Sequence, residues 1–179
     1  IYRLNQELGI TVILVEHNVE ALAEFTDRII LMDKGRIVCD GEPEKVLTNR
    51  RVLSDAGLHP PPVTQLAYRL IDDGFPLKKI PVRLDDACRI ILNSFNEGCA
   101  SRKPCFTVHQ HALALHEYAH NGTMAPHNQR NTKPSLFNDE SDAFIRLENV
   151  VFFYEKGKTV LDGVSLNFFP GELVAVMGL

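Results

Sequence analysis

The sequence predicts an α/β fold, and three stretches of the chain carry that prediction. Residues 10–15 are a β-branched apolar run without alternation, which is typical of a parallel strand buried on both faces. Residues 1–47 as a whole alternate helix, strand, helix, strand, strand. Near the other end, residues 172–177 form a second apolar strand that leads directly into Gly178.

The first predicted helix is marked by an apolar face and a stop signal. Ile1, Leu4 and Leu8 recur at helical spacing, and Gly9 is suited to end the helix in a left-handed conformation. A hairpin follows further on, with strands at 28–33 and 36–39 joined by a turn at Lys34 and Gly35. We therefore expect a helix, a buried strand and a hairpin in this part of the chain.

A further helix is predicted to begin after Gly41. Pro43 fits the first turn, where its missing N–H costs nothing, and Glu42 and Glu44 complement the helix dipole there. Another helical pattern covers residues 64–71, whereas residues 96–142 are rich in His, Asn, Pro and Ser and predict a linker.

The last part of the chain is predicted to be rich in β-structure. Strands are expected at 144–152 and 159–169, followed by a turn at Pro170 and Gly171 and then the final strand. The chain thus has the pattern of two partial α/β domains separated by a connector.

Composition and charge restrict the class of protein. The chain has 179 residues, 45% of them hydrophobic, a formal net charge of −4 and a pI near 6.0, so it has no basic footprint for nucleic acid. No apolar stretch approaches the roughly 20 residues that span a bilayer. The four cysteines lack CxxC spacing, which favours reduced thiols in a cytosolic protein: Cys39, Cys88, Cys99 and Cys105.

The strand that ends in Gly178 resembles the entrance to a phosphate-binding loop. Such a loop needs a buried strand, the pattern G-x-x-x-x-G-K-[ST] and a helix whose free N–H groups hold phosphates. Only the strand and the first glycine lie within the sequence, so we expect a fragment that does not hold or hydrolyse a nucleotide by itself. Two half-domains would also expose sheet edges that the missing halves should cover.

Motifs at both ends resemble one family of ATPases. The segment Val15-Glu16-His17-Asn18, with residues 27–37 and 40–43, is similar to the end of an ABC-transporter ATPase domain. Residues 145–178 resemble the beginning of a second such domain. Because the end of one domain precedes the beginning of another along the chain, the resemblance implies a subunit with two tandem ATPase domains.

A stretch between these motifs narrows the resemblance. Residues 53–58, 62–70 and 74–77 look like the C-terminal extension of ATPase subunits of energy-coupling-factor transporters, which import vitamins and transition-metal ions. The fold class implied is α/β, with the C-terminal part of one P-loop ATPase domain, a helical or irregular linker, and the β-rich N-terminal start of a second P-loop ATPase domain. The implied boundaries are 1–47 for the first domain, 48–82 for the extension, 83–142 for the linker and 143–179 for the second domain.

Three residues take site roles from this resemblance. His17 corresponds to the switch histidine that contacts the γ-phosphate and orients the attacking water, Tyr154 to the aromatic residue that stacks on adenine, and Gly178 to the first glycine of the phosphate loop. Simpler alternatives stay open: a histidine that caps the helix near Asn18, an aromatic residue that covers the core, and a glycine that only ends a strand. Glu16 is expected to have a supporting or solvated role.

The resemblance also implies cofactors, partners and a location. ATP and Mg²⁺ would be used by the full-length parent. The partners would be transmembrane transporter subunits and the second ATPase domain of the same chain, at the cytoplasmic face of the cell membrane as a peripheral protein. Alternatives are a tandem sugar-importer ATPase, a tandem ABC protein that acts on ribosomes, and a scaffold that binds no nucleotide.

One histidine cluster lies outside the resemblance. His116 and His120 would share a face of a helix, and such a pair is a possible transition-metal ligand set. No carboxylate or cysteine is spaced to complete the site, so a polar linker enriched in histidine is favoured and no metal site is assigned. The cluster comprises His109, His111, His116, His120 and His127.

Overall fold

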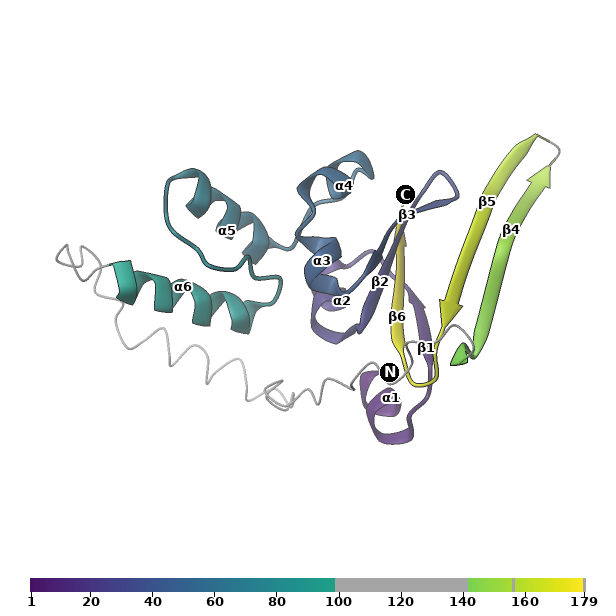
Figure 1. The fold of residues 1–179 in the computed structure, drawn as a ribbon, viewed down its shortest axis with the longest axis horizontal. Coiled ribbons are helices and arrows are strands. Elements are labelled where there is room, and N and C mark those ends of the chain that lie inside the picture. The colour runs from purple at the N-terminus through teal and green to yellow at the C-terminus, as the bar shows by residue number, and fades with distance from the viewer. Residues whose placement is uncertain (99–141, 156, 179) are drawn as a thin grey trace.

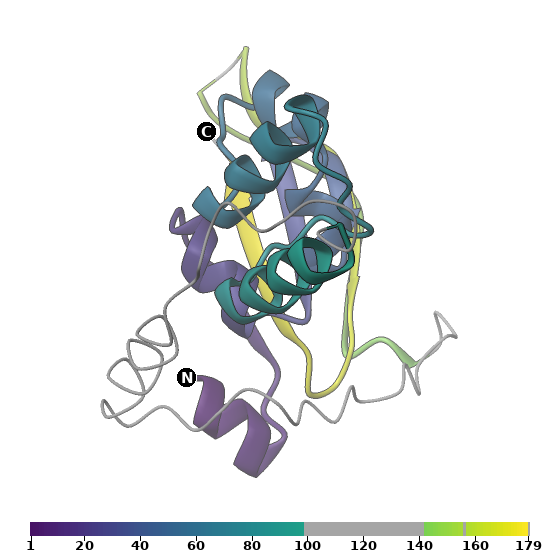
Figure 2. The ribbon, with the colours of Figure 1, turned by 90° about the vertical axis from the view of Figure 1, so that its left-hand side faces the viewer.

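A four-stranded sheet lies between a layer of helices and a β-hairpin in the computed structural model of the chain (Figures 1 and 2). The structure describes residues 1–98, 142–155 and 157–178. The helices α2 to α6 lie on one side of the sheet and the hairpin β4–β5 on the other.

The order of strands in the sheet joins the two ends of the sequence. The order is β1, β6, β2, β3, with bounds Val12–Val15, Leu173–Gly178, Arg28–Asp33 and Arg36–Gly41. Strand β6 is parallel to both β1 and β2, while β2 and β3 are antiparallel. The last strand of the described chain therefore lies between two strands from its beginning.

The hairpin forms its own two-stranded sheet and covers one face of the larger one. Strands β4 (Ile145–Glu155) and β5 (Lys158–Phe168) pair antiparallel, with several register shifts. Their inner side chains pack on alternate residues of β2 and β6 and form one buried apolar cluster: Val164, Leu166 and Phe168 with Ile30 and Val174.

Helices bury the opposite face of the sheet. Helices α2 (Val19–Phe25) and α3 (Pro43–Leu47) supply Leu22 and Leu47 to a second cluster. The strands contribute the alternate side chains that point away from the hairpin: Ile29, Leu31, Ala175 and Met177. Because residues i and i+1 of a strand face opposite sides, β2 and β6 are buried on both faces and hold both clusters together.

The region after α3 is helical. It contains α4 (Arg50–Asp55), α5 (Pro62–Asp72) and α6 (Leu84–Gly98), and α5 contacts α6. Helix α6 occupies the start of the predicted linker 83–142, and its residue Ala87 is buried. The rest of that segment, from 99 to 141, lies outside the described residues.

Several local predictions are confirmed. Helix α1 (Tyr2–Leu8) ends at Gly9, whose φ of 65° is left-handed. The turn of the β2–β3 hairpin has φ of 47° at Lys34 and 77° at Gly35, as a two-residue hairpin turn of the favoured type requires. Helix α5 lies where the pattern in 64–71 predicted it.

The prediction that residues 10–15 are buried on both faces is wrong. Strand β1 begins only at Val12, and the side chains of Ile13 and Val15 are 43% and 71% exposed. The reason is that β1 is an outer strand of the described sheet, and the hairpin covers β2 and β6 instead. An apolar run thus predicted the strand but not its position in the sheet.

The two halves also do not stand apart as exposed half-sheets. The sequence predicts that residues 1–47 and 143–179 belong to different domains, yet β1, β2 and β3 form one sheet with β6. The assignment of these segments to two domains of a longer parent stays a prediction, because the pairing seen in this chain does not test it.

A buried asparagine fastens these two segments near the start of β6. The side chain of Asn5 is fully buried, and its Nδ2 donates to the carbonyl oxygens of Ile10 at 2.7 Å and Gly171 at 2.9 Å. A buried polar group stabilises a fold only when it is hydrogen-bonded, and here both partners are backbone carbonyls.

Replacing Asn5 by alanine is expected to destabilise the chain by about 1–3 kcal/mol, because the buried carbonyl of Gly171 and the partly buried carbonyl of Ile10 lose their donor. Urea unfolding followed by circular dichroism would measure the change. The control is Arg3→Ala on the same helix, since among the described residues Arg3 pairs with Glu7 alone and its side chain is 86% exposed. Equal midpoints for the two variants would contradict the role assigned to Asn5.

Candidate functional site

Three parallel strands end at one edge of the sheet and bring two predicted site residues to that edge. Val15 of β1 is paired with Val176 of β6, and Met32 of β2 is paired with Gly178. His17 follows β1 by two residues and so lies level with Gly178. The carboxyl ends of parallel strands are where open α/β sheets bind ligands.

Gly178 lies so close to β2 that no other residue fits without movement. An ideal Cβ at this position would lie 2.2 Å from the carbonyl oxygen of Met32 and 3.1 Å from its carbonyl carbon. Strand packing therefore requires a glycine here, whatever the residue does toward a ligand. This requirement supports the simpler alternative of a strand-end glycine, and it is compatible with a phosphate loop, where a close backbone approach is also needed.

A carboxylate organises the turn that carries His17. Glu16 Oε1 accepts hydrogen bonds from the backbone N–H groups of His17 at 2.8 Å and Asn18 at 3.1 Å. Asn18 Oδ1 accepts from the backbone N–H of Ala21 at 3.1 Å and so caps α2. The cap is Asn18 and not His17, which removes helix capping as the explanation for the histidine.

Of the two roles expected for Glu16, supporting or solvated, these hydrogen bonds favour the supporting one. The hydrogen bond from the His17 backbone N–H, followed by the one from Asn18, lowers the pKa of its carboxyl group. The carboxylate therefore stays charged beside His17 and supports the turn. A sequence signal existed, because an acidic residue placed just before a predicted helix start can accept from its free N–H groups.

Tyr154 lies on β4 toward the tip of the β4–β5 hairpin. Its side chain is 81% exposed, and its ring meets that of Phe152 edge to face with 4.9 Å between centroids. Within the described residues, no hydrogen bond or ring contact joins Tyr154 to His17 or Gly178. An exposed ring can stack on a planar ligand, whereas it covers little of the core.

The same half of the hairpin is fastened to the turn between β2 and β3. The Asp162 backbone N–H donates to the carbonyl oxygen of Gly35 at 2.9 Å, and Arg36 Nη2 pairs with the Asp162 carboxylate at 2.5 Å. That turn follows the carboxyl end of β2. These contacts hold the hairpin beside the edge that carries His17 and Gly178.

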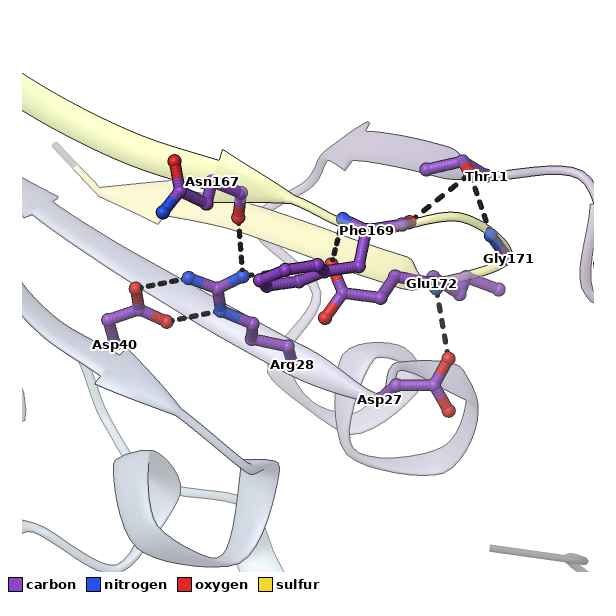
Figure 3. Close-up of polar contacts among 9 residues, drawn as sticks. Thr11, Asp27, Arg28, Asp40, Asn167, Phe169, Gly171 and Glu172 are labelled. Atoms are coloured by element: carbon purple, nitrogen blue, oxygen red, sulfur yellow. Dashed lines mark hydrogen bonds and ion pairs between the residues drawn. The ribbon is translucent and has the colours of Figure 1, made fainter. Parts of the chain in front are cut away.

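At the opposite edge of the sheet, Arg28 links the two sequence segments (Figure 3). Its Nε and Nη2 each donate to the Asp40 carboxylate at 2.6 Å, and its Nη1 donates to the carbonyl oxygen of Asn167 at 2.8 Å. A bidentate guanidinium–carboxylate pair is among the stronger and more directional polar contacts. Arg28 therefore fixes the end of β5 relative to β2 and β3.

Further hydrogen bonds fix the turn that leads into β6. The Thr11 hydroxyl accepts from the backbone N–H of Gly171 at 2.8 Å, and Asp27 Oδ2 accepts from that of Leu173 at 2.9 Å. The Glu172 carboxylate accepts from the backbone N–H of Phe169 at 2.9 Å (Figure 3). These contacts position β6 at its start and hence Gly178 at its end.

The pKa values of two charged residues at the centre of this group, Glu172 and Arg28, are shifted. Burial raises the pKa of Glu172, and this effect outweighs the Phe169 N–H and the Arg28 guanidinium, whose Nη1 lies 3.6 Å away. The hydrogen bond to Asp40 raises the pKa of Arg28. Arg28 thus stays charged, while Glu172 is held in an environment that favours its neutral form.

The described part of the chain contains no group of three His, Cys, Asp or Glu side chains that could hold a metal ion. The cluster His109, His111, His116, His120 and His127 lies outside the described residues, so its metal hypothesis stays untested. In the same described part, no helix has the length and apolar character needed to cross a membrane.

Known proteins that are similar to this chain over nearly its whole length include ATP-binding proteins. Two putative ABC transporter ATP-binding proteins match 98% of the chain: one from Methanosarcina mazei with 26% identity and one from Methanosarcina acetivorans with 27%. The chain spans about a quarter of their length, 26% and 28% respectively. No family model matches the chain.

A third relative matches half of the chain. The energy-coupling factor transporter ATP-binding protein EcfA2 of Streptococcus pyogenes is 31% identical over 91 residues, which is 51% of this chain and 32% of that protein. The recognised resemblance to ABC-transporter ATP-binding proteins, including the energy-coupling-factor type, is therefore confirmed at the level of homology.

Changing Gly178 to alanine is expected to destabilise the sheet by about 1–3 kcal/mol, because the new methyl group forces β6 away from Met32. Thermal unfolding of the two proteins would measure the difference. Gly41→Ala is a matched control, since a Cβ at Gly41 meets no atom closer than 3.9 Å. If Gly178→Ala melted with Gly41→Ala, the close approach of β6 and β2 would be wrong.

The free energy of unfolding is expected to depend on pH through Glu172. Because its folded-state pKa is raised, its contribution to stability is complete below the unfolded pKa and is lost as the pH rises through the folded pKa. The wild type should therefore lose stability relative to Glu172→Gln over that pH interval. Urea unfolding at a series of pH values would measure the difference.

Glu44 provides a contrast of opposite sign. Burial alone would raise its pKa, but the Arg83 charge and the hydrogen bonds outweigh burial and lower it. Its contribution is present above the unfolded pKa and is lost as the pH falls through the folded pKa. Parallel pH profiles for Glu172→Gln and Glu44→Gln would contradict the assigned environments.

Proposed function

Because the homologues of this chain are ABC transporter ATP-binding proteins, we propose that it is part of an ATP-binding and ATP-hydrolysing subunit that powers a membrane importer. The observation that carries this proposal is the position of His17 and Gly178 at one carboxyl edge of the sheet. The proposal concerns the longer parent, since the chain spans about a quarter of the relatives that match nearly all of it.

We assign His17 to the terminal phosphate of ATP. In this role it contacts the γ-phosphate and orients the water that attacks it, and positioning of this kind is the main protein contribution to phosphoryl transfer. The backbone at Gly178 begins the loop that surrounds the phosphates. Glu16 keeps the His17 turn in place through its two backbone hydrogen bonds.

Tyr154 is assigned to the adenine ring. Its exposed ring offers a π-face on which a base can stack, and the hairpin that carries it is held against the turn after β2. If Tyr154 stacks on adenine, its removal should weaken nucleotide binding. If it is only a surface aromatic residue in contact with Phe152, its removal should leave nucleotide affinity unchanged.

The described residues do not form a Mg²⁺ site. Mg²⁺ prefers a few carboxylate and hydroxyl oxygens together with substrate phosphates and waters. Among the described residues, the carboxylates at the carboxyl ends of the parallel strands are Glu16, directly after β1, and Asp33, the last residue of β2, and Glu16 is engaged with two backbone N–H groups. Any Mg²⁺ used by the parent would need ligands from elsewhere in the parent.

We further propose the energy-coupling-factor type of importer, for a vitamin or metal ion. The support is the 91-residue match to an energy-coupling factor ATPase and the resemblance of residues 53–77 to the extension of such subunits. Transmembrane subunits and a second ATPase domain of the same parent would be its partners, at the cytoplasmic face of the membrane. Closure of two such domains around ATP would drive the membrane partner.

In the parent subunit, His17→Ala is expected to lower ATP turnover about 100-fold, because the attacking water loses its orientation. Nucleotide affinity should change much less, and this separates loss of chemistry from loss of folding. Arg3→Ala is the control. Arg3 lies on α1, which precedes the start of β1, whereas His17 follows the end of β1. Unchanged turnover would remove His17 from the mechanism.

Tyr154→Ala in the parent is expected to weaken nucleotide binding about 5- to 100-fold, as removal of a base-stacking ring does. Tyr154→Phe keeps the ring and should keep the affinity. Equilibrium titration with a fluorescent ATP analogue would measure both variants. Equal affinities for the wild type and Tyr154→Ala would leave Tyr154 as a surface aromatic residue.

A further inference from the structure

A pocket lies in the helical extension, among residues other than those assigned to the sheet edge. It is formed by α4, the loop after it and α5, and its volume is about 640 Å³. The pocket is open to solvent on one side, because Arg50, His59 and Arg69 are exposed. The lining residues used below are Arg50, Leu58, His59, Pro60, Tyr68 and Arg69.

The lining of the pocket is rich in basic residues, although the net charge of the chain is −4. Two arginines and one histidine line it, and none of its lining residues in the described part of the chain is acidic. The arginines come from different helices, Arg50 from α4 and Arg69 from α5. Asp72 lies outside the lining but pairs with Arg50, so Arg69 is the charge that has no ion-pair partner among the described residues. Such a charge at a concave surface attracts ligands of the opposite sign.

Arg50 is held in a defined orientation at the pocket wall. Its guanidinium carbon lies 3.7 Å from the centroid of the Tyr68 ring, and its Nη2 contacts the Asp72 carboxylate at 3.1 Å. The Tyr68 hydroxyl donates to the carbonyl oxygen of Thr48 at 2.5 Å, which fixes the ring. A guanidinium has five N–H donors, so Arg50 keeps donors for a ligand after pairing with Asp72.

Arg69 contributes the second charge. Its side chain has no hydrogen bond or ion pair within the described residues, and it lies in the last turn of α5. A basic residue there also stabilises the helix dipole, a small effect that does not require a pocket. The helix dipole does not explain why Arg69 and Arg50 line the same pocket.

We propose that this pocket binds a small phosphate monoester. The phosphate oxygens can accept from the guanidinium of Arg69 and from the N–H donors that Arg50 keeps, and a guanidinium presents its donors in the planar geometry that phosphate oxygens accept. The organic part of the ligand lies against Leu58 and Pro60, which are half-buried and apolar. The proposal uses no residue of the sheet edge, so it stands or falls separately from ATP hydrolysis.

Calorimetric titration of the whole chain with phenyl phosphate tests the proposal. We expect saturable binding that is tighter than for inorganic phosphate, benzoate or phenol, because only phenyl phosphate combines two charges with an apolar body. Arg69→Gln should weaken binding about tenfold, as loss of a charge-assisted hydrogen bond does. Arg51→Gln is the matched control, since Arg51 is on α4, lies outside the pocket lining and is 92% exposed.

Unchanged melting temperatures for Arg69→Gln and Arg51→Gln would confirm that both variants fold. The proposal is overturned if phenyl phosphate shows no saturable binding, or if Arg69→Gln and Arg51→Gln bind it equally. Benzoate binding as tightly as phenyl phosphate would overturn the phosphate class. Phenol binding equally well would reduce the site to an apolar pocket.

Discussion

The structure depends on the insertion of β6 between β1 and β2. This strand comes from the end of the described chain, and both of its neighbours come from the first 33 residues. Its side chains alternate between the two buried clusters, with Ala175 and Met177 on the helix side and Val174 on the hairpin side. Without β6, both apolar clusters would lose their central side chains, and burial of such side chains is the main stabilising contribution to folding. The carboxyl ends of the parallel strands would also lose Gly178.

Directional polar contacts reinforce this apolar arrangement at the start of β6. Asn5, Thr11 and Asp27 bond to the backbone of residues 171–173, while Arg28 bonds to that of Asn167. Hydrophobic burial alone would tolerate sliding of a strand by two residues, whereas hydrogen bonds to particular backbone groups do not. The same contacts therefore set the register that brings Gly178 level with His17.

Local features of the sequence predicted much of this structure. The glycine after α1, the Lys34–Gly35 turn and the proline that begins α3 each act within a few residues, so their conformations could be inferred directly. The exposure of β1 and the pairing of β6 could not, because they depend on which distant segment supplies the neighbouring strand. For the same reason the sequence indicated His17 and Gly178 separately, but neither their common edge nor the constraint that Met32 places on Gly178.

Hydrogen exchange of the whole chain, resolved by residue, would test the insertion of β6 most directly. If β6 lies between β1 and β2, the backbone amides of residues 173–178 should be protected to the same degree as those of β2, because both strands open only with the sheet. If the amides of 173–178 exchange as fast as in an unfolded peptide while β2 and β3 stay protected, β6 is not part of this sheet. The common edge of His17 and Gly178 would then be wrong as well.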